Sequence, residues 1–302
     1  MKLNWKTLTI PSIVFLQLTG IGILGNCFLL FLCRFHFLTG NRNQPIHLII
    51  ISLAFSNILL VLFRGIPTVT KMWGVPCLLD GLGIRIITYL QRFPRGLSLS
   101  IACLLTAFQA IILTPQSSMW AELRTRAIKC IIPCILLVWI FSMLINIIGF
   151  LFLTNLKNTT ESKDGCNFGY GILDLYNTDH LTITFATFVH DTLFVCLMAG
   201  FSGYMVFILY RHNQQIKYIH STSLSQKTTH EVRATKVILL LVGTFVILNM
   251  PSPIFILGLF YFKESNTWVR HVSTLLSLCY PTVSSFILIS IDTQMSKGCC
   301  IH

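Results

Sequence analysis

Four charged side chains lie inside long apolar segments of this 302-residue chain: Arg64, Arg92, Arg95 and Asp191. A charge in a membrane-spanning helix costs about 2.5–3.5 kcal/mol on insertion scales, so each of them needs a partner or a function. An ion pair between Arg95 and Asp191 explains both residues, either as a link between two helices or as a ligand contact. Arg64 and Arg92 lie nearer the ends of their segments, where a long side chain also reaches the membrane surface.

These residues do not fit catalysis. Hydrolysis within a membrane needs a serine–histidine pair or two aspartates, and Asp191 is the only acid well inside an apolar segment. The chain has no glycine-rich phosphate loop and no metal-spaced cluster, and nothing in it resembles a channel filter. We therefore expect no enzyme, no metal and no cofactor. His190, next to Asp191, is expected to be an ordinary buried histidine, with a proton-sensitive role as the alternative.

Seven apolar segments must position these residues, since each is free of charge or nearly so. A bilayer core needs about 20 apolar residues as a helix. The segments lack the alternation of a membrane barrel, which is the other structure that satisfies its backbone in lipid. We predict an all-α membrane protein, one seven-transmembrane-helix domain over 1–302, with helices near 8–34, 46–71, 82–113, 128–154, 181–210, 234–262 and 268–291.

Composition and charge agree with this fold class. Hydrophobic residues make up 54% of the chain and charged residues 11%, against about 25% charged residues in soluble domains. The net charge of +12 is spread over the loops rather than gathered on one face, so we expect no nucleic-acid partner. The lipid bilayer is the expected surrounding.

The loops on the two sides of the membrane differ in charge. One side holds eleven basic and three acidic residues, and the other holds eight basic and six acidic residues. The positive-inside rule then places the N-terminus outside and the C-terminus in the cytosol of a multi-pass plasma membrane protein. The first segment is expected to act as a signal anchor, and the fifth helix to continue past the membrane into the basic loop 211–233.

Two cysteines and one sequon fall in the predicted outer loops. Because Cys77 and Cys166 are the only cysteines expected on the oxidising side, a single disulfide between them is predicted. Asn158 begins an Asn-Thr-Thr sequon in the same outer region, and we expect it to be glycosylated. The cysteines inside the segments are expected to be ordinary small apolar residues. They are Cys27, Cys33, Cys103, Cys130, Cys134, Cys196 and Cys279.

Amides inside the segments predict hydrogen bonds between helices. Asn57, Asn146 and Asn249 are such residues, and contacts of this kind contribute about 0.6 kcal/mol on average. The chain shows no internal repeat, which weakens the interpretation as a small multi-span transporter.

Several motifs together resemble the vomeronasal type-1 receptors, a family of rhodopsin-like G-protein-coupled chemosensory receptors. The resemblance runs from the first segment to Asp292. It rests on YLQRFPRG at 89–96, ACLLTAFQAI at 102–111, TP at 114–115, WI at 139–140, ILYRH at 208–212, RAT at 233–235 and CYPT at 279–282.

The chain keeps some features of the wider rhodopsin-like class and lacks others. Gly25-Asn26, Trp139 and Pro281 match the class. Ala107-Phe108-Gln109 stands in place of the acidic–arginine–tyrosine motif, and Asn57 stands where the class has a sodium-binding aspartate. We therefore do not expect the arginine switch or the sodium site of that class.

The chain also departs from the vomeronasal family. Ile84 occupies the position of the family's helix-three cysteine, and Cys77 lies seven residues earlier. Cys166 matches the family's outer-loop cysteine, so a Cys77–Cys166 bridge would have to be displaced. His190 stands where the family usually has proline.

The resemblance implies a receptor for a small pheromone or odorant that activates a heterotrimeric G protein of the inhibitory class. The alternatives are a bitter-taste-type receptor, a small transporter and a poorly coupled decoy receptor. A ligand pocket is expected in the outer half of the bundle, lined by Arg64, Tyr89, Arg92, Arg95, Asp191, Asn249, Phe255 and Tyr261. The G-protein contact is expected at Trp120, Arg124, Arg126, Arg211, Lys217, Arg233 and Lys236.

Overall fold

The computed structural model of the chain describes residues 5–38, 44–73, 81–114, 118–155, 178–218, 239–244, 246–248 and 267–297. Nearly all of these residues are helical. Six of the helices are long and apolar enough to cross a membrane. They are α1 (Trp5–Leu38), α2 (Gln44–Met72), α3 (Gly81–Leu113), α4 (Ser118–Asn155), α5 (Thr178–Tyr218) and α8 (Thr267–Lys297).

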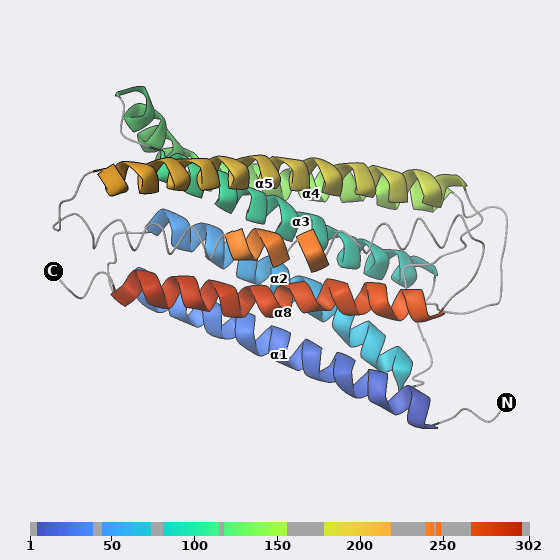
Figure 1. Cartoon of the computed structure of the whole chain (residues 1–302). Coiled ribbons are helices and arrows are strands. Elements are labelled where there is room, and N and C mark those ends of the chain that lie inside the picture. Colours follow the sequence, from blue (N-terminus) through green and yellow to red (C-terminus); the bar gives the residue numbers. More distant parts are fainter. Residues whose placement is uncertain are drawn as a thin grey trace.

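The direction of the last two long helices implies one more crossing. Helices α5 and α8 run the same way along the bundle (Figure 1), so Tyr218 and Thr267 lie at opposite ends. The 48 residues between them must therefore return across the bundle. The helical residues 239–244 and 246–248 lie on that path beside α8 (Figure 1). They fall within the helix predicted at 234–262, most of which is outside the described residues.

The helices begin and end close to the predicted residues, except at the start of α4 and at the ends of α5 and α8. We predicted the fourth helix from residue 128, but α4 begins at Ser118, so that boundary was wrong by ten residues. The segment from Ser118 to Lys129 contains charges that hydropathy assigns to a loop, yet a helix can extend beyond the lipid into water. Helix α5 likewise continues to Tyr218, as expected from the residues that follow its apolar part.

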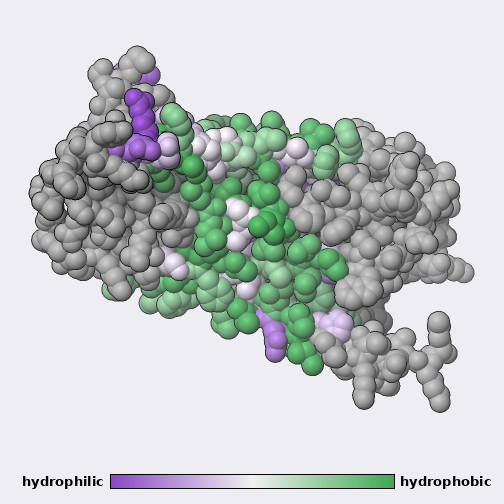
Figure 2. Space-filling model, in the orientation of Figure 1, coloured by the Kyte–Doolittle hydropathy of each residue, from purple (hydrophilic) through white to green (hydrophobic). Residues whose placement is uncertain are grey.

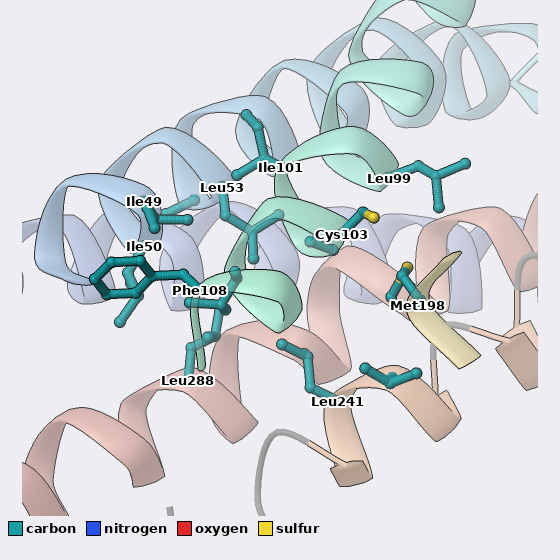
Figure 3. Packing of buried hydrophobic residues seen from close by; sticks show 14 of the residues in the cluster. Ile49, Ile50, Leu53, Leu99, Ile101, Cys103, Phe108, Met198, Leu241 and Leu288 are labelled. Atoms are coloured by element: carbon teal, nitrogen blue, oxygen red, sulfur yellow. The ribbon is translucent and has the colours of Figure 1, made fainter. Parts of the chain in front are cut away.

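Helix α3 holds the bundle together, because it packs against α2, α4 and α5. Its side chains belong to a hydrophobic core that also takes residues from α2, α5, α8 and the helical residues near Leu241 (Figure 3). Leu53, Met198 and Leu288 in this core are fully buried. The core therefore fixes the rotation of α3, and with it the direction in which Arg95 points.

The outward faces of the helices are apolar. Leu24, Leu137 and Phe207 are 71%, 63% and 59% exposed, and in water such surface would be unfavourable at about 25 cal/mol per Å². Figure 2 shows hydrophobic residues covering the middle of one face of the molecule. Helices α4 and α5 contribute most of their apolar span to the exterior, which is what a helix bundle in lipid requires.

Two glycines let α1 approach α8 closely. A Cβ atom at Gly25 would lie 2.5 Å from the Ser285 Oγ, and one at Gly22 would lie 2.7 Å from the Thr282 Oγ1. The same Thr282 hydroxyl donates hydrogen bonds to the carbonyls of Leu278 and, across the seam, Leu18, the latter at 3.3 Å. Only glycine fits at these two positions, so the α1–α8 contact depends on them.

The cysteines predicted to be ordinary apolar residues carry no disulfide within the described residues. Cys33 and Cys103 are buried, whereas Cys27, Cys130 and Cys196 are exposed on the apolar exterior. The predicted partners Cys77 and Cys166 lie outside the described residues.

Candidate functional site

The predicted ion pair between helices three and five is formed. The Arg95 Nη2 on α3 donates to the Asp191 Oδ2 on α5 at 2.9 Å. The two side chains are 12% and 6% exposed. Arg95 follows Pro94 near the middle of α3, and Asp191 lies in the first half of α5. A charge-assisted hydrogen bond this well buried is among the stronger polar contacts in proteins, so it links the central helix to a peripheral one.

His190 forms the second contact of Asp191. Its Nδ1 lies 3.3 Å from the Asp191 Oδ1. Its ring lies 4.7 Å from that of Phe194 and 6.4 Å from that of Phe141, measured between centroids. The His190 ring also lies close to the backbone of α3, since a Cβ at Gly96 would be in ordinary van der Waals contact with the His190 Cε1 at 3.7 Å. The His190 side chain is 13% exposed, which agrees with a largely buried histidine whose ring orients the carboxylate that holds Arg95, while the alternative proton-sensitive role stays a prediction.

Two further arginines lie near this pair. Arg64 on α2 is within electrostatic range of Arg92 and Arg95 on α3. Both Arg64 and Arg92 are half-buried. The Arg64 Nε is fully buried and has no hydrogen-bond partner among the described residues. Both arginines had two interpretations, snorkelling to the surface or lining a pocket. The burial of the Arg64 Nε argues against snorkelling by Arg64, and its role in a pocket stays a prediction.

Aromatic rings extend from the arginines toward the middle of the bundle. Tyr89 and Phe93 on α3 stack with centroids 6.0 Å apart and planes 1° from parallel. Phe93 meets Trp139 of α4 edge-on at 6.0 Å, and the Trp139 Nε1 donates to the Ser52 Oγ on α2 at 2.9 Å. Tyr89 thus stands one helical turn before Arg92, beside an apolar surface.

A buried polar network lies deeper in the bundle. Asn57 donates to the Ser284 Oγ at 3.1 Å and accepts from the Ser98 Oγ at 2.7 Å. Asn26 donates to the Pro281 carbonyl at 2.9 Å and accepts from Asn57 at 3.4 Å. The network joins α1, α2, α3 and α8. Sequence reasoning predicted a helix–helix role for Asn57 but missed Ser98 and Ser284, whose only signal was a hydroxyl in an apolar segment.

The opposite end of the bundle has its own contacts. The Thr114 Oγ1 at the end of α3 and the Tyr204 hydroxyl on α5 are 3.1 Å apart. Arg124 on α4 donates to the Ile112 carbonyl at 2.6 Å, so part of this predicted G-protein contact is used within the chain. Arg126 pairs with Glu122 on the exposed face of α4. Arg211 is exposed on α5.

Comparison with known families decides the assignment. The model of the family described as the vomeronasal organ pheromone receptor family matches residues 9–301. This chain belongs to that family. It is accordingly a chemosensory receptor of the G-protein-coupled type and a multi-pass plasma membrane protein, and its family is one of receptors rather than enzymes.

Individual vomeronasal type-1 receptors match over nearly the whole of this chain. The chain is 35% identical to human vomeronasal type-1 receptor 4 over 288 residues, covering 94% of this chain and 95% of the relative. It is 34% identical to human vomeronasal type-1 receptor 1, covering 95% and 82%. Rat vomeronasal type-1 receptor 93 is 32% identical, covering 96% and 93%.

The fold of this vomeronasal receptor is that of rhodopsin. A crystal structure of squid rhodopsin aligns with a TM-score of 0.70 over 99% of this chain and 87% of that chain. The sequence identity is 14%, so this likeness concerns the fold alone. It agrees with the seventh crossing that the parallel course of α5 and α8 requires.

The structure brings part of the predicted receptor site together. In the half of the bundle where α3 and α5 begin lie five of the predicted residues: Arg64, Tyr89, Arg92, Arg95 and Asp191. Of these, Arg95 and Asp191 form an ion pair. Trp120 and Lys217 lie in the helical parts of α4 and α5 at the other end. No group of three histidine, cysteine or acidic side chains in the described ranges could hold a metal ion. Asn249, Phe255, Tyr261, Arg233, Lys236, Asn158, Cys77 and Cys166 lie outside the described residues.

Proposed function

We propose that this vomeronasal receptor binds a small organic molecule between the halves of α2, α3 and α5 that contain Arg64, Arg95 and Asp191. One observation carries the proposal: a buried ion pair connects the central helix to α5 beside two further half-buried arginines. Polar groups that converge in apolar surroundings are the usual features of a small-molecule site. Asn249, Phe255 and Tyr261 would complete the lining.

The orientation that suits this function has the N-terminus outside the cell. The excess of basic residues on the side where α4 begins supports a cytosolic position for that end. The arginine cluster then opens toward the extracellular medium, from which an odorant or pheromone arrives. Arg124, Arg126 and Arg211, together with Trp120, Lys217, Arg233 and Lys236, would face the cytosol.

Signalling would follow from a change in helix arrangement. A ligand shifts the equilibrium only by the difference between its affinities for the two arrangements. Contacts with Arg95 or Asp191 provide such a difference, because they act on the link between α3 and α5. The far ends of the same two helices are joined by Thr114 and Tyr204. A movement at the ligand site would thereby alter the surface offered to a heterotrimeric G protein, for which we propose the inhibitory class.

Imaging of cyclic nucleotide and calcium in cells that express the receptor tests this proposal. A panel of volatile and non-volatile small molecules should contain at least one that lowers cyclic AMP. A toxin that ADP-ribosylates inhibitory α subunits should abolish the response. Compound uptake without any G-protein response would instead favour a transporter and contradict the proposal.

A further inference from the structure

Among the described residues of the half that contains Arg64 and Asp191, the arginine charges outnumber the single carboxylate that contacts them. Arg64, Arg92 and Arg95 lie within electrostatic range of one another. Asp191 contacts Arg95 through one oxygen and His190 through the other. In the part of the chain that the structure describes, no carboxylate contacts Arg64 or Arg92. Two guanidinium charges therefore remain without an acidic partner among these residues.

Burial makes this imbalance costly. The Arg64 Nε is inaccessible to solvent and has no acceptor among the described residues. A buried donor without a partner costs about 1–3 kcal/mol, and more when it is charged. Like charges at close range in a medium of low dielectric constant add to that cost. An arrangement of this kind is stabilised by an anion that accepts from both guanidinium groups.

The geometry points to a specific chemical class of ligand. We infer that Arg64 and Arg92 together bind the carboxylate, sulfate or phosphate group of a small organic anion whose remaining body is apolar. This inference rests on the proposed function and names the ligand class of the same site. The Arg95–Asp191 pair is not disturbed, since Arg95 is already matched by its own acid.

The residue types fit oxyanions better than other groups. The planar guanidinium offers parallel N–H donors that match the two oxygens of a carboxylate or sulfate. The half-buried Tyr89 ring, which stacks on the buried Phe93 ring, lies one helical turn before Arg92 and would give the apolar part of the ligand a surface. A neutral ligand of the same shape would leave both guanidinium charges without an anion.

The same oxyanion can come from two sources, a soluble ligand or the head group of a membrane lipid, and the test must separate them. We would use alkyl and arylalkyl carboxylates and sulfates, each paired with its neutral amide or alcohol. One measurement is the thermal unfolding temperature of the full-length receptor, purified in neutral detergent. The other is the cellular response described above. The variants are Arg64→Gln, Arg92→Gln and Arg64→Lys, with Lys129→Gln as the control, because Lys129 is exposed at the opposite end of the bundle.

The anionic member of at least one pair should raise the unfolding temperature while its neutral partner does not. Loss of one charge-assisted contact should weaken anion binding about tenfold or more in Arg64→Gln and Arg92→Gln. Arg64→Lys keeps the charge but loses the parallel N–H donors of the guanidinium group, so this variant should bind the anion with intermediate affinity. It also provides a readout if the glutamine variants fail to fold. Lys129→Gln should bind like the unaltered receptor.

The outcomes distinguish this inference from the proposed function. Stabilisation by anions without any signalling would support the anion site and contradict the receptor mechanism. Signalling by neutral compounds alone, unaffected by Arg64→Gln, would overturn the anion site and leave the receptor mechanism intact. Native mass spectrometry that finds an anionic lipid bound to the receptor, and lost in Arg64→Gln, would assign the site to a lipid head group and overturn the soluble ligand.

Discussion

Ser98 donates a hydrogen bond of 2.7 Å to the side-chain oxygen of Asn57, at a depth where both residues are completely or almost completely shielded from solvent. The side-chain amide of Asn57 in turn donates hydrogen bonds to Asn26 and Ser284. Four helices are thus joined by uncharged groups at the position where the rhodopsin-like class places an aspartate. The receptor should accordingly need no counter-ion there.

Asn57→Ala should destabilise the receptor by about 1–3 kcal/mol, because it leaves the Ser98 hydroxyl without its buried acceptor. A thiol-reactive fluorophore can follow the thermal unfolding, since Cys33 and Cys103 are buried in the folded protein. Ser290→Ala, which removes an exposed hydroxyl, is the matched control and should change stability by less than about 0.5 kcal/mol. Equal unfolding temperatures for the two variants would mean that the network contributes nothing.

Arg95→Ala and Asp191→Ala should each cost about 3–5 kcal/mol, because each leaves a buried charge without its partner. The swapped variant, with Arg95→Asp and Asp191→Arg, should recover part of the loss of surface expression and thermal stability. If the swap behaves as the sum of two independent losses, the two residues are not coupled.

The chain provides an internal control for that experiment. Arg126 and Glu122 form an exposed pair one helical turn apart on α4, and pairs of this kind contribute about 0.3–0.5 kcal/mol. A double-mutant cycle on them should give a coupling several times smaller than that of Arg95 and Asp191. Comparable couplings would mean that burial does not strengthen the inner pair.

Replacing Lys217, Arg233 and Lys236 by glutamine should reduce signalling, since these residues carry part of the proposed positive surface for the G protein. Ligand binding and the amount of receptor at the cell surface should stay the same. Lys129→Gln removes an exposed charge from the same end of the bundle and should have little effect. Full signalling by the triple variant would mean that these basic residues only orient the chain in the membrane and do not contact the G protein.

Asn158→Gln should abolish a glycosidase-sensitive shift in electrophoretic mobility, because the charge bias places this sequon outside the cell. A C-terminal epitope tag should stain only after the cells are permeabilised. Staining of intact cells would contradict the proposed orientation and, with it, the cytosolic position of Arg124 and Arg211.

Cys77 and Cys166 should be joined in receptor taken from the cell surface. Peptide mapping under non-reducing conditions would find the linked peptides, and reduction would release them. A disulfide requires the two Cα atoms to come within about 7 Å. Because Cys77 lies seven residues before the position of the family's cysteine, the outer loops must bring it toward Cys166 to meet this distance. Two free thiols in surface receptor would contradict the pairing.

Sequence reasoning paired the buried charges Arg95 and Asp191 but did not find the partners of the buried uncharged side chains. Arg95 and Asp191 could be matched in advance because a buried arginine needs an acid, and only one acid lies deep in an apolar segment. Hydroxyls are common, so nothing in the sequence singled out Ser98 as the partner of Asn57. That choice depends on the rotation of each helix about its axis, which is set by the packing of side chains such as Leu53 and Leu288.

The same limit explains the errors at the helix ends. Hydropathy indicates which residues prefer the apolar part of the membrane, whereas a helix ends where its backbone hydrogen bonds stop. Helix α4 continues to Ser118 through charged residues, and Arg124 then reaches the Ile112 carbonyl of α3. A residue predicted as a contact for another protein thus also binds its own neighbouring helix.

The close contact at Gly22 and Gly25 has a consequence for measuring motion in this receptor. Because α1 and α8 pack this closely at the two glycines, we expect spin labels on their exposed faces to keep one separation with and without ligand. A label on α5, which among the described helices packs mainly against α3, should change its distance from that reference on activation. The α1–α8 contact at Gly22 and Gly25 therefore provides a fixed reference distance for measuring the displacement of the other helices.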